Sequence, residues 1–424
     1  MKTILDLHIH SRFSRACSKD LTLPNIARWC ERKGIDIVGT GDFTHPVWLS
    51  EIKNQLTESE PGIFRLRIGD PISRTEIGSP ARFMLTTELS SIYKQGDKVR
   101  RVHHLICMPT IAAVERLVAA LEARGCNLKS DGRPILGLNS KELLQIVLEA
   151  DSRSLLIPAH AWTPWFAIFG SESGFDSIEE CFGDELAKEI HAIETGLSSD
   201  PPMNWRLSAL DRVMLVSNSD AHSLRNLGRE ANQLDLAEQS FDAFSSILKN
   251  RDRTRFLQTL EFFPEEGKYH ADGHRLCGAR LTPAETKRQG GKCPVCGKPV
   301  TVGVLHRVDA LADRPEGTRS PSAVPFTHLV PLEEVIADTL GKGKGTKTVN
   351  DLYLKLTDIA PEFSLLFDFP LADLAGRVAE PIIEALRRLR EGKVKVLPGY
   401  DGEYGTIKIF SEEERRGPAQ GKLI

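Results

Sequence analysis

Short β-branched runs alternate with amphipathic helical patterns from Lys2 to about Leu260, and no other feature limits the possible folds as much. Seven runs are expected to form strands: Thr3–His8, Asp36–Thr40, Phe83–Thr87, Val102–Met108, Ser154–His160, His191–Thr195 and Val213–Ser217. The helices between them have recognisable ends, such as Pro24 near the start of the first and Gly34 after it. Strand–helix repetition of this kind predicts an α/β fold with a parallel sheet or a (βα) barrel.

Histidine and carboxylate residues follow nearly every predicted strand. In a (βα) barrel, the C-terminal ends of the strands meet at one face and carry the catalytic side chains. The residues at these positions are His8, His10, Asp42, His45, Glu88, His103, His104, His160, Glu194, Asp220 and His222. Alternation along a strand allows only one of His103 and His104 to face the site, and we expect it to be His104.

His8 and His10 lie two residues apart on a strand, so their side chains point to the same side and can bind one cation. A single His-x-His is a weak signal, because histidines also serve as hydrogen-bonded core residues. Its recurrence at later strand ends, finishing with Asp220 and His222, indicates a metal site. Imidazole and carboxylate ligands suit ions that polarise a phosphoryl oxygen. We therefore expect two or three divalent ions (zinc, manganese or magnesium) and a phosphoesterase.

Two short loops of one design contain most of the remaining ligand-type residues. They read His274-Arg-Leu-Cys277-Gly278 and Cys293-Pro-Val-Cys296-Gly297. Each loop brings two ligands to one ion, which predicts a closed, four-coordinate and therefore structural zinc site at His274, Cys277, Cys293 and Cys296. His270 is the competing fourth ligand.

The length of 424 residues exceeds what one hydrophobic core usually organises. We expect a catalytic barrel over 1–262, a zinc module over 263–310 and a mainly helical region over 311–424. The net charge of −3 excludes a uniformly basic protein, but 267–307 hold eight Lys or Arg against two acids. No apolar run is long enough to cross a bilayer and no signal peptide is recognisable, so a cytoplasmic protein without a membrane partner is expected.

Two C-terminal segments could contact nucleic acid. The glycine–lysine run with Lys342 and Lys344 precedes a helix expected to start near Thr348, so it could hold a phosphate or simply form a linker. Tyr400 and Tyr404 lie in a glycine-rich turn, where they could stack on a base or pack a hairpin.

The strand-end motifs resemble those of the polymerase-and-histidinol-phosphatase (PHP) family. The matching stretches are Asp6-Leu-His8-Ile-His10-Ser11, Gly39-Thr-Gly-Asp42-Phe-Thr-His45, Thr87-Glu88, Pro158-Ala-His160 and Ser219-Asp220-Ala-His222. The resemblance implies a distorted seven-stranded barrel with a trinuclear metal centre, in which Glu88 bridges two ions. His8, His10 and Asp220 would hold one ion, His160 with His103 or His104 another, and His222 the third. Phe43 stands where the family usually has a histidine, so two ion positions are expected and the third stays open.

The order of modules narrows the resemblance to the endonuclease Q family. It is carried by the Gly-Thr-Gly-Asp42-Phe-Thr-His45-Pro stretch and by Lys268-Tyr-His-Ala-Asp-Gly-His274-Arg, Val302-Gly-Val-Leu-His-Arg-Val-Asp309 and Pro398-Gly-Tyr-Asp-Gly-Glu-Tyr404-Gly. It implies an endonuclease that cleaves DNA on the 5′ side of hypoxanthine, uracil, xanthine and abasic sites, with damaged DNA and other repair or replication proteins as partners.

Three further residues are candidates for a role on DNA. Trp162 and Trp165 beside His160 could inspect a base or pack in the core, and Asp200 could be a catalytic acid or a helix cap. Asp220 and Glu88 are the other catalytic candidates. The alternatives to an endonuclease are a phosphatase for small phosphomonoesters and a zinc-bearing DNA-binding protein with an inactive barrel, which Phe43 would explain.

Overall fold

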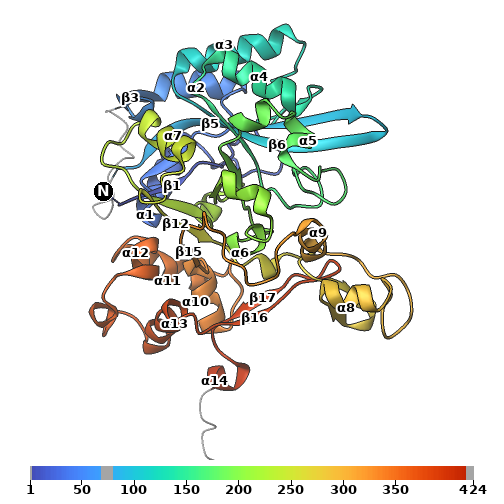
Figure 1. Cartoon of the computed structure of the whole chain (residues 1–424). Coiled ribbons are helices and arrows are strands. Elements are labelled where there is room, and N and C mark those ends of the chain that lie inside the picture. Colours follow the sequence, from blue (N-terminus) through green and yellow to red (C-terminus); the bar gives the residue numbers. More distant parts are fainter. Residues whose placement is uncertain (1, 68–79, 417–424) are drawn as a thin grey trace, which may run out of the picture.

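The computed structural model of the chain describes residues 2–67 and 80–416, and its main sheet lies in one large part from which two smaller parts extend (Figure 1). All seven expected strands form, several with different bounds. They are β1 Lys2–Asp6, β2 Ile37–Gly39, β5 Arg82–Gln95, β6 Lys98–Met108, β8 Leu155–Pro158, β9 Ala192–Glu194 and β10 Met214–Val216. Further strands are β3 Leu56–Glu60, β4 Ile63–Leu66, β7 Ile135–Leu136, β11 Ala231–Asp235, β12 Phe256–Glu261 and β15 Phe326–His328.

The main sheet is mixed, so the expectation of a parallel sheet is only partly right. β1, β2 and β5 are parallel neighbours, and β9 pairs in parallel with β10. In contrast, β6 runs antiparallel to both β5 and β8, and β11 runs antiparallel to β1. The connection between β5 and β6 explains the difference, because only two residues, Gly96 and Asp97, separate Gln95 from its partner Lys98. A two-residue turn can join only antiparallel strands, and Gly96 supplies the positive φ of 58°.

Helices cover the sheet and fix its strand ends. The helices of this part are α1 Leu23–Lys33, α2 Pro46–Gln55, α3 Ile111–Ala123, α4 Ser140–Ala150, α5 Ile178–Phe182, α6 Pro201–Asn204 and α7 Phe241–Asn250. The first ends as its sequence indicates, because Gly34 takes a φ of 83° and its amide donates to the carbonyls of Cys30 and Glu31. Asn139 caps α4 by accepting a hydrogen bond from the Glu142 amide.

Two hydrophobic clusters occupy opposite faces of the strands. Leu5 and Ile37 belong to one cluster, whereas their neighbours on the other face, including Val38, belong to the second. Leu105 and Ile106 divide between the clusters in the same way. Strands buried on both faces form a rigid frame, and each fully buried large aliphatic side chain stabilises it by about 1.5–3 kcal/mol.

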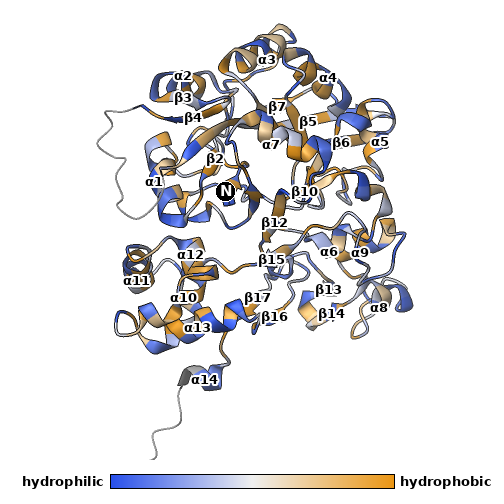
Figure 2. Cartoon of the chain, turned by 60° about the vertical axis from the view of Figure 1, so that its left-hand side comes forward, coloured by the Kyte–Doolittle hydropathy of each residue, from blue (hydrophilic) through white to orange (hydrophobic). Residues whose placement is uncertain are grey.

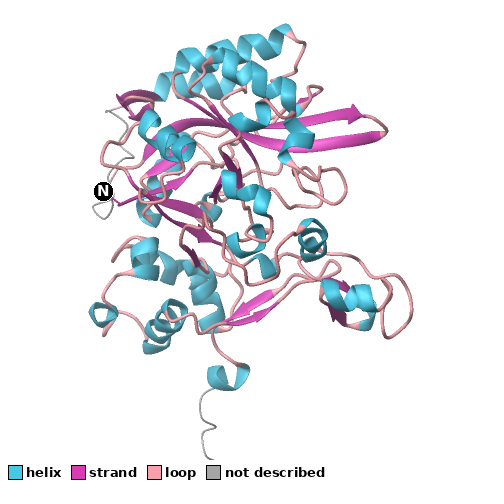
Figure 3. Cartoon of the chain, in the orientation of Figure 1, coloured by secondary structure: helices cyan, strands magenta, loops and turns pink. Residues whose placement is uncertain are grey.

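The rest of the chain forms two smaller parts (Figures 2 and 3). The first contains β13 Asp272–His274, β14 Ala279–Leu281, α8 Pro283–Arg288 and α9 Val304–Leu311. The second contains α10 Leu332–Leu340, α11 Lys347–Thr357, α12 Glu362–Phe367, α13 Glu380–Arg390, α14 Glu412–Arg416 and the hairpin of β16 Lys395–Leu397 and β17 Thr406–Lys408. The helices α10 to α13 share a hydrophobic cluster of their own, and β15, which precedes them, pairs with β12. Among the helices described, none has both the length and the hydropathy to cross a bilayer.

Candidate metal centre

Two groups of potential ligand atoms meet at Glu88 in the interior of the main part. His8, His10, Glu88 and Asp220 form one group, and Glu88, His103 and His160 form the other. Glu88 Oε2 lies 3.5 Å from His8 Nε2 and 3.2 Å from His10 Nε2. Its other oxygen, Oε1, lies 2.7 Å from His103 Nδ1 and 3.1 Å from His160 Nε2. Glu88 therefore presents one oxygen to each group, which is the geometry of a bridging carboxylate.

Three of the histidines are held in the tautomer that a metal ligand requires. The Nδ1 atom of His8 lies 3.0 Å from a Glu194 oxygen, and that of His10 lies 3.0 Å from Asp42 Oδ1. His160 Nδ1 lies 3.1 Å from the Thr163 hydroxyl. Because these oxygens accept the Nδ1 proton, the Nε2 lone pair of each ring faces Glu88.

The site needs positive charge in its centre. His8 Nε2 is buried and has no hydrogen-bond partner among the described residues. Burial alone would lower the pKa of His8, but the charges of Glu194 and Glu88 raise it well above its usual value. A buried cluster of carboxylates and imidazole lone pairs takes up either protons or cations. The donor set therefore fits divalent ions, and its mixture of nitrogen and oxygen ligands suits zinc or manganese.

Two carboxylates outside the ligand groups hold the histidines in place. Asp42 accepts hydrogen bonds from the amide and hydroxyl of Ser11 (both 2.7 Å) and from the Ser14 hydroxyl (2.8 Å). Glu194 accepts from the His160 amide at 2.8 Å and from the Asn218 side chain at 2.9 Å. Asp42 was expected to be a ligand, but its oxygens are engaged by these donors and by His10, so it supports His10 from behind.

The backbone is strained where these residues lie. Asp42, His160 and Asp220 have φ values of 47°, 30° and 46°, in the left-handed region that non-glycine residues rarely adopt. Such conformations persist where surrounding contacts over-determine them, and they concentrate at functional sites. Each of the three follows the end of a strand, and its backbone conformation directs its side chain toward Glu88 or toward the residues that support the histidines.

His103 faces the site, and the expectation of His104 is wrong. The β5–β6 register pairs Ser90 with His103, which places His103 on the same face as Glu88. His104 points to the opposite face, where its Nε2 lies 2.9 Å from the Ser140 hydroxyl and burial lowers its pKa to about 3. The sequence did not reveal this register, because the antiparallel hairpin was not anticipated.

Three other expected site residues lie outside both ligand groups. His45 precedes α2 and stacks on Phe13 at 4.4 Å between ring centroids. His222 lies beside the site, with its ring 4.6 Å from that of His10 and its Nδ1 2.8 Å from the Asp220 carbonyl. Asp200 caps α6 by accepting from the Met203 amide at 3.0 Å, and it forms an ion pair with His328. The roles of His45 and His222 at a third ion stay predictions. Of the two roles proposed for Asp200, the hydrogen bond from the Met203 amide fits the helix cap.

Arg133 belongs to the site although no motif indicated it. Its guanidinium lies 2.9 Å from Glu88 Oε2, and its side chain is 23% exposed. The charge of Glu88 raises the pKa of Arg133. Burial would raise the pKa of Glu88, but the charges of His103 and Arg133 lower it well below its usual value. Arg133 comes from the loop before β7, where a lone arginine gives no signal in the sequence. The structure thus adds a fixed cation at the edge of the ligand groups.

The cysteine loops form the cluster that their spacing predicts. His274, Cys277, Cys293 and Cys296 bring their ligand atoms within 4.8 Å of one another. Gly278 and Gly297 follow the second ligand of each loop with φ values of 64° and 72°. Burial would raise the pKa of Cys293, but the backbone amides of Cys296 and Val295 lower it to about 7. Three cysteines and one histidine suggest a structural zinc ion.

His274 is the fourth member of this cluster, and His270 is not. His270 is 5% exposed and lies outside the group of four ligand atoms. Burial lowers the pKa of His270 to about 4. It therefore packs as a neutral core residue.

The candidate DNA-binding aromatic residues differ in how much of each is exposed to solvent. Trp162 is 1% exposed and donates its indole proton to Asn204, so of its two candidate roles its contacts are those of core packing. Tyr400 is 7% exposed and packs against Gly273 and Arg280. Trp165 is 48% exposed and Tyr404 is 74% exposed.

The two lysines of the glycine–lysine run make local contacts. Lys342 donates to the Thr348 hydroxyl, and Lys344 forms an ion pair with Glu334 at 2.6 Å. Both side chains lie in the turn between α10 and α11. Phosphate binding by Lys342 and Lys344 stays a prediction, as does base contact by Tyr404.

Comparisons with known sequences cover nearly the whole chain. Residues 331–393 match the family model described as the MJ0043 C-terminal domain. The uncharacterized protein YqxK of Bacillus subtilis is 32% identical over 418 residues, which are 96% of this chain and 99% of that protein. The uncharacterized protein MJ0043 of Methanocaldococcus jannaschii is 33% identical over 255 residues, which are 59% of this chain and 31% of that protein.

Two solved structures match over the full length. The lesion-specific endonuclease PfuEndoQ of Pyrococcus furiosus has a TM-score of 0.83 and 32% identity, with 100% of this chain and 98% of that one covered. An endonuclease Q complex with a 27-mer duplex carrying an abasic lesion at the active site has a TM-score of 0.81 and 32% identity, with both chains fully covered. Together with the buried histidine–carboxylate site, these matches define an endonuclease. The chain belongs to the endonuclease Q family.

Proposed function

We propose that the protein is a metal-dependent DNA endonuclease that cleaves the phosphodiester 5′ of abasic sites and of the deaminated bases hypoxanthine, uracil and xanthine. The observation that carries the proposal is the position of Glu88, which presents one oxygen to each of two ligand groups. Paired ions suit in-line displacement at phosphorus, because they stabilise both the attacking and the leaving oxygen. The relative with an abasic duplex at its active site supports the substrate class.

We infer that the frame of the site is the distorted seven-stranded barrel of the PHP type. Hydrogen-bonded pairing connects each strand to the next in the order β1, β2, β5, β6 and β8. Beyond β8, β9 lies beside it and pairs with β10. An isolated bridge between Ile9 and Ala221, which follow β1 and β10, supports closure of the ring. The module boundaries at 262 and 310 remain part of the proposal.

When bound, the ions would polarise the phosphate and lower the pKa of the attacking water. His8, His10 and Asp220 would hold one ion, His103 and His160 the other, and Glu88 both. Asp220, whose side chain is 24% exposed, is the most exposed of these ligands and can accept a proton from the attacking water. Arg133 can donate to a non-bridging phosphate oxygen, because its guanidinium lies at the edge of both groups. Asp200 has its oxygens engaged by the α6 amide and His328, which favours a positioning role.

Incision of defined duplexes tests the proposal. Duplexes with a single abasic site, deoxyinosine or deoxyuridine are incubated with the protein, with and without chelator and with added zinc, manganese or magnesium. We expect incision on the 5′ side of the lesion that chelator abolishes. Hydrolysis of p-nitrophenyl phosphate without DNA incision would favour a phosphatase, and DNA retention without incision would favour a binding protein. An Asp220→Ala variant that cuts normally would contradict the ligand assignment.

Phe43 does not by itself support the inactive-barrel alternative. Its side chain is fully buried in the hydrophobic cluster, and both ligand groups assemble without a contribution from its position. The third ion, the cytoplasmic location and the repair or replication partners are further parts of the proposal. They follow from the sequence expectations and from family membership alone.

A further inference from the structure

A tryptophan is exposed directly beside the metal-binding groups. Trp165 lies in the turn that runs from His160 to Phe166. The Thr163 hydroxyl contacts His160 Nδ1 and donates to the Trp165 carbonyl at 2.9 Å. Phe166, the next residue, packs its ring 4.7 Å from that of His103 and accepts a hydrogen bond from the His103 amide. Trp165 is therefore anchored on both sides by residues that support cluster histidines, while 48% of it stays exposed.

Arg101 lies over this exposed ring. Its guanidinium carbon is 5.0 Å from the centroid of the Trp165 ring and 5.9 Å from that of Phe166. Neighbouring cations are neutralised, because Arg100 pairs with Glu180 and Arg307 pairs with Asp176. Within residues 2–67 and 80–416, no carboxylate forms an ion pair with Arg101. Its charge is therefore available to a ligand.

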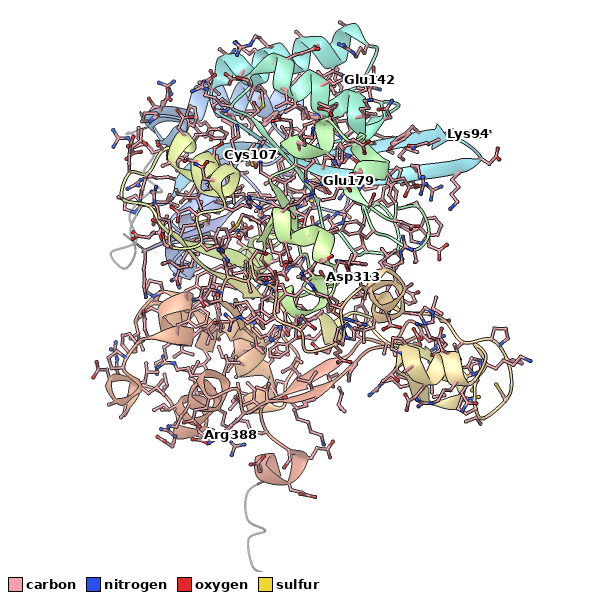
Figure 4. All side chains as sticks on the ribbon, viewed as in Figure 1. Lys94, Cys107, Glu142, Glu179, Asp313 and Arg388 are labelled. Atoms are coloured by element: carbon pink, nitrogen blue, oxygen red, sulfur yellow. The ribbon has the colours of Figure 1, made fainter. Side chains whose placement is uncertain are left out.

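The hairpin of β5 and β6 projects from the main part (Figure 3), and it carries further cations beyond Arg101. Lys94 and Lys98 flank its two-residue turn, and Figure 4 places Lys94 at the outer end of the hairpin. Both lysines are exposed, and in the described part of the chain neither forms an ion pair. Lys98, Arg101 and Trp165 line one surface cavity, whose remaining unpaired acid, among the residues described, is Glu172. The surface thus combines an aromatic face with three cations, Lys94, Lys98 and Arg101, and two acids, Glu172 and the turn residue Asp97. None of these charged side chains forms an ion pair within the described residues.

The arrangement is fixed before any ligand arrives. The Arg101 amide donates to the Ser173 carbonyl, and the Ser173 hydroxyl donates to the Arg101 carbonyl. The Phe166 amide contacts the same hydroxyl at 3.4 Å. Ser173 therefore ties the tryptophan turn to β6. Because the two backbone segments are held in this way, they lose little conformational entropy when the side chains of Trp165 and Arg101 bind a ligand.

We propose that Trp165 and Arg101 form a stacking platform for the DNA strand that flanks the cleaved phosphodiester, with Lys94 and Lys98 on its phosphates. An exposed indole covers one face of a base, which suits a base that remains in the strand rather than one enclosed in a pocket. Unpaired cations beside it suit a polyanion. The inference rests on the proposed function, because it takes the cleaved polymer to be DNA.

The test compares Trp165→Ala and Trp165→Phe with the unchanged protein. Binding is measured in chelator with an abasic duplex that carries 2-aminopurine beside the lesion, and cleavage is measured on that duplex and on bis(p-nitrophenyl) phosphate. We expect Trp165→Ala to weaken DNA binding about tenfold and to lower the ratio of DNA to small-diester cleavage by the same factor, because stacking on one base is lost. Trp165→Phe should retain most of the affinity. Val47→Ala, which trims an exposed apolar side chain on α2, is the matched control.

Three results would overturn the platform. The first is wild-type affinity in Trp165→Ala, and the second is a parallel loss on both substrates, which would mean that Trp165 only positions His160. The third concerns salt: Lys94→Gln with Lys98→Gln should lower the slope of log affinity against log salt by about one to two, and an unchanged slope contradicts phosphate contacts. If the unchanged protein itself neither binds nor cuts DNA, the proposed function fails instead.

Discussion

The two metal-binding regions of this molecule are built in opposite ways. The histidine–carboxylate site lies between two hydrophobic clusters, and its ligands are fixed by Asp42, Glu194 and strained backbone. The zinc module lacks such a core. Between 267 and 303 its described buried hydrophobic residues are only Ala271, Ala279 and Cys293. In the first region the packed core positions the metal ligands, whereas in the second we expect metal binding to stabilise the fold.

Loss of a zinc ligand should have the largest effect on folding, and it tests directly whether the second region depends on its metal. We expect Cys293→Ser to release zinc and unfold 267–303, because zinc binding supplies on the order of 10 kcal/mol to modules of this kind. The variant should be cut by proteases within this segment, while the main part stays resistant. Limited proteolysis with mass spectrometry measures the sites. Cys126→Ser, at a cysteine outside the cluster, is the control, and a protease-resistant module in Cys293→Ser would contradict the prediction.

Removal of the bridging carboxylate should abolish activity and leave the fold intact. We expect Glu88→Ala to lower DNA cleavage by on the order of 10³-fold or more, because two ions lose a shared ligand worth several kcal/mol in the transition state. The chain should still fold, since both hydrophobic clusters are untouched, although the thermal unfolding midpoint should fall because the favourable contacts of Glu88 with His103 and Arg133 are lost. Cleavage rates and metal content check the result. Glu149→Ala, on the exposed face of α4, should change neither, and full activity in Glu88→Ala would refute the bridge.

Substitution of a residue that supports a ligating histidine should have an intermediate effect, on metal affinity. Asp42→Asn replaces the carboxylate that accepts the Nδ1 proton of His10. We expect metal affinity to fall about 10- to 100-fold, as is usual for partners of ligating histidines. Excess metal should then restore much of the cleavage rate, in contrast to Glu88→Ala. A titration of activity against metal concentration measures both, and a variant that no metal concentration rescues would mean that Asp42 is itself a ligand.

The sequence predicted what depends on local spacing and missed what depends on register. His8, His10 and the paired cysteine loops are close in sequence, so their geometry follows from strand and turn periodicity. The choice between His103 and His104 depends on which β5 residue pairs with each, and a two-residue turn between antiparallel strands decides it.

Long-range contacts account for the remaining differences. Arg133 reaches Glu88 from a loop 45 positions away, which no motif records. Trp162 and Trp165 look alike in the sequence, yet the packing against Asn204 buries the first and the turn exposes the second. Side chains whose role is set by packing between distant segments therefore need the fold before they can be assigned.

The smallest predicted effect concerns a carboxylate that no ion would compensate. Glu261 is fully buried at the end of β12 and accepts hydrogen bonds from Thr195 and Ser217. The β11–β12 register, in which Ala231 pairs with Leu260, brings Glu230 close to it. Burial, together with the nearby charge of Asp200, raises the pKa of Glu261 from 4.5 to about 7. At the metal site cations compensate the buried negative charge, whereas the Glu261 carboxylate is neutralised by a proton.

A raised carboxyl pKa in the folded state means that stability is lost as pH rises. Below pH 4.5 Glu261 is protonated whether folded or unfolded, whereas between pH 4.5 and about 7 only the folded protein keeps the proton. We expect Glu261→Gln, which stays neutral, to match the unchanged protein at low pH and to be more stable by about 2 kcal/mol at pH 6. Urea unfolding across this range measures the difference, with Glu149→Gln as control. If the two stability curves run parallel, the folded protein does not hold that proton, and the buried charge must be balanced by a cation here as well.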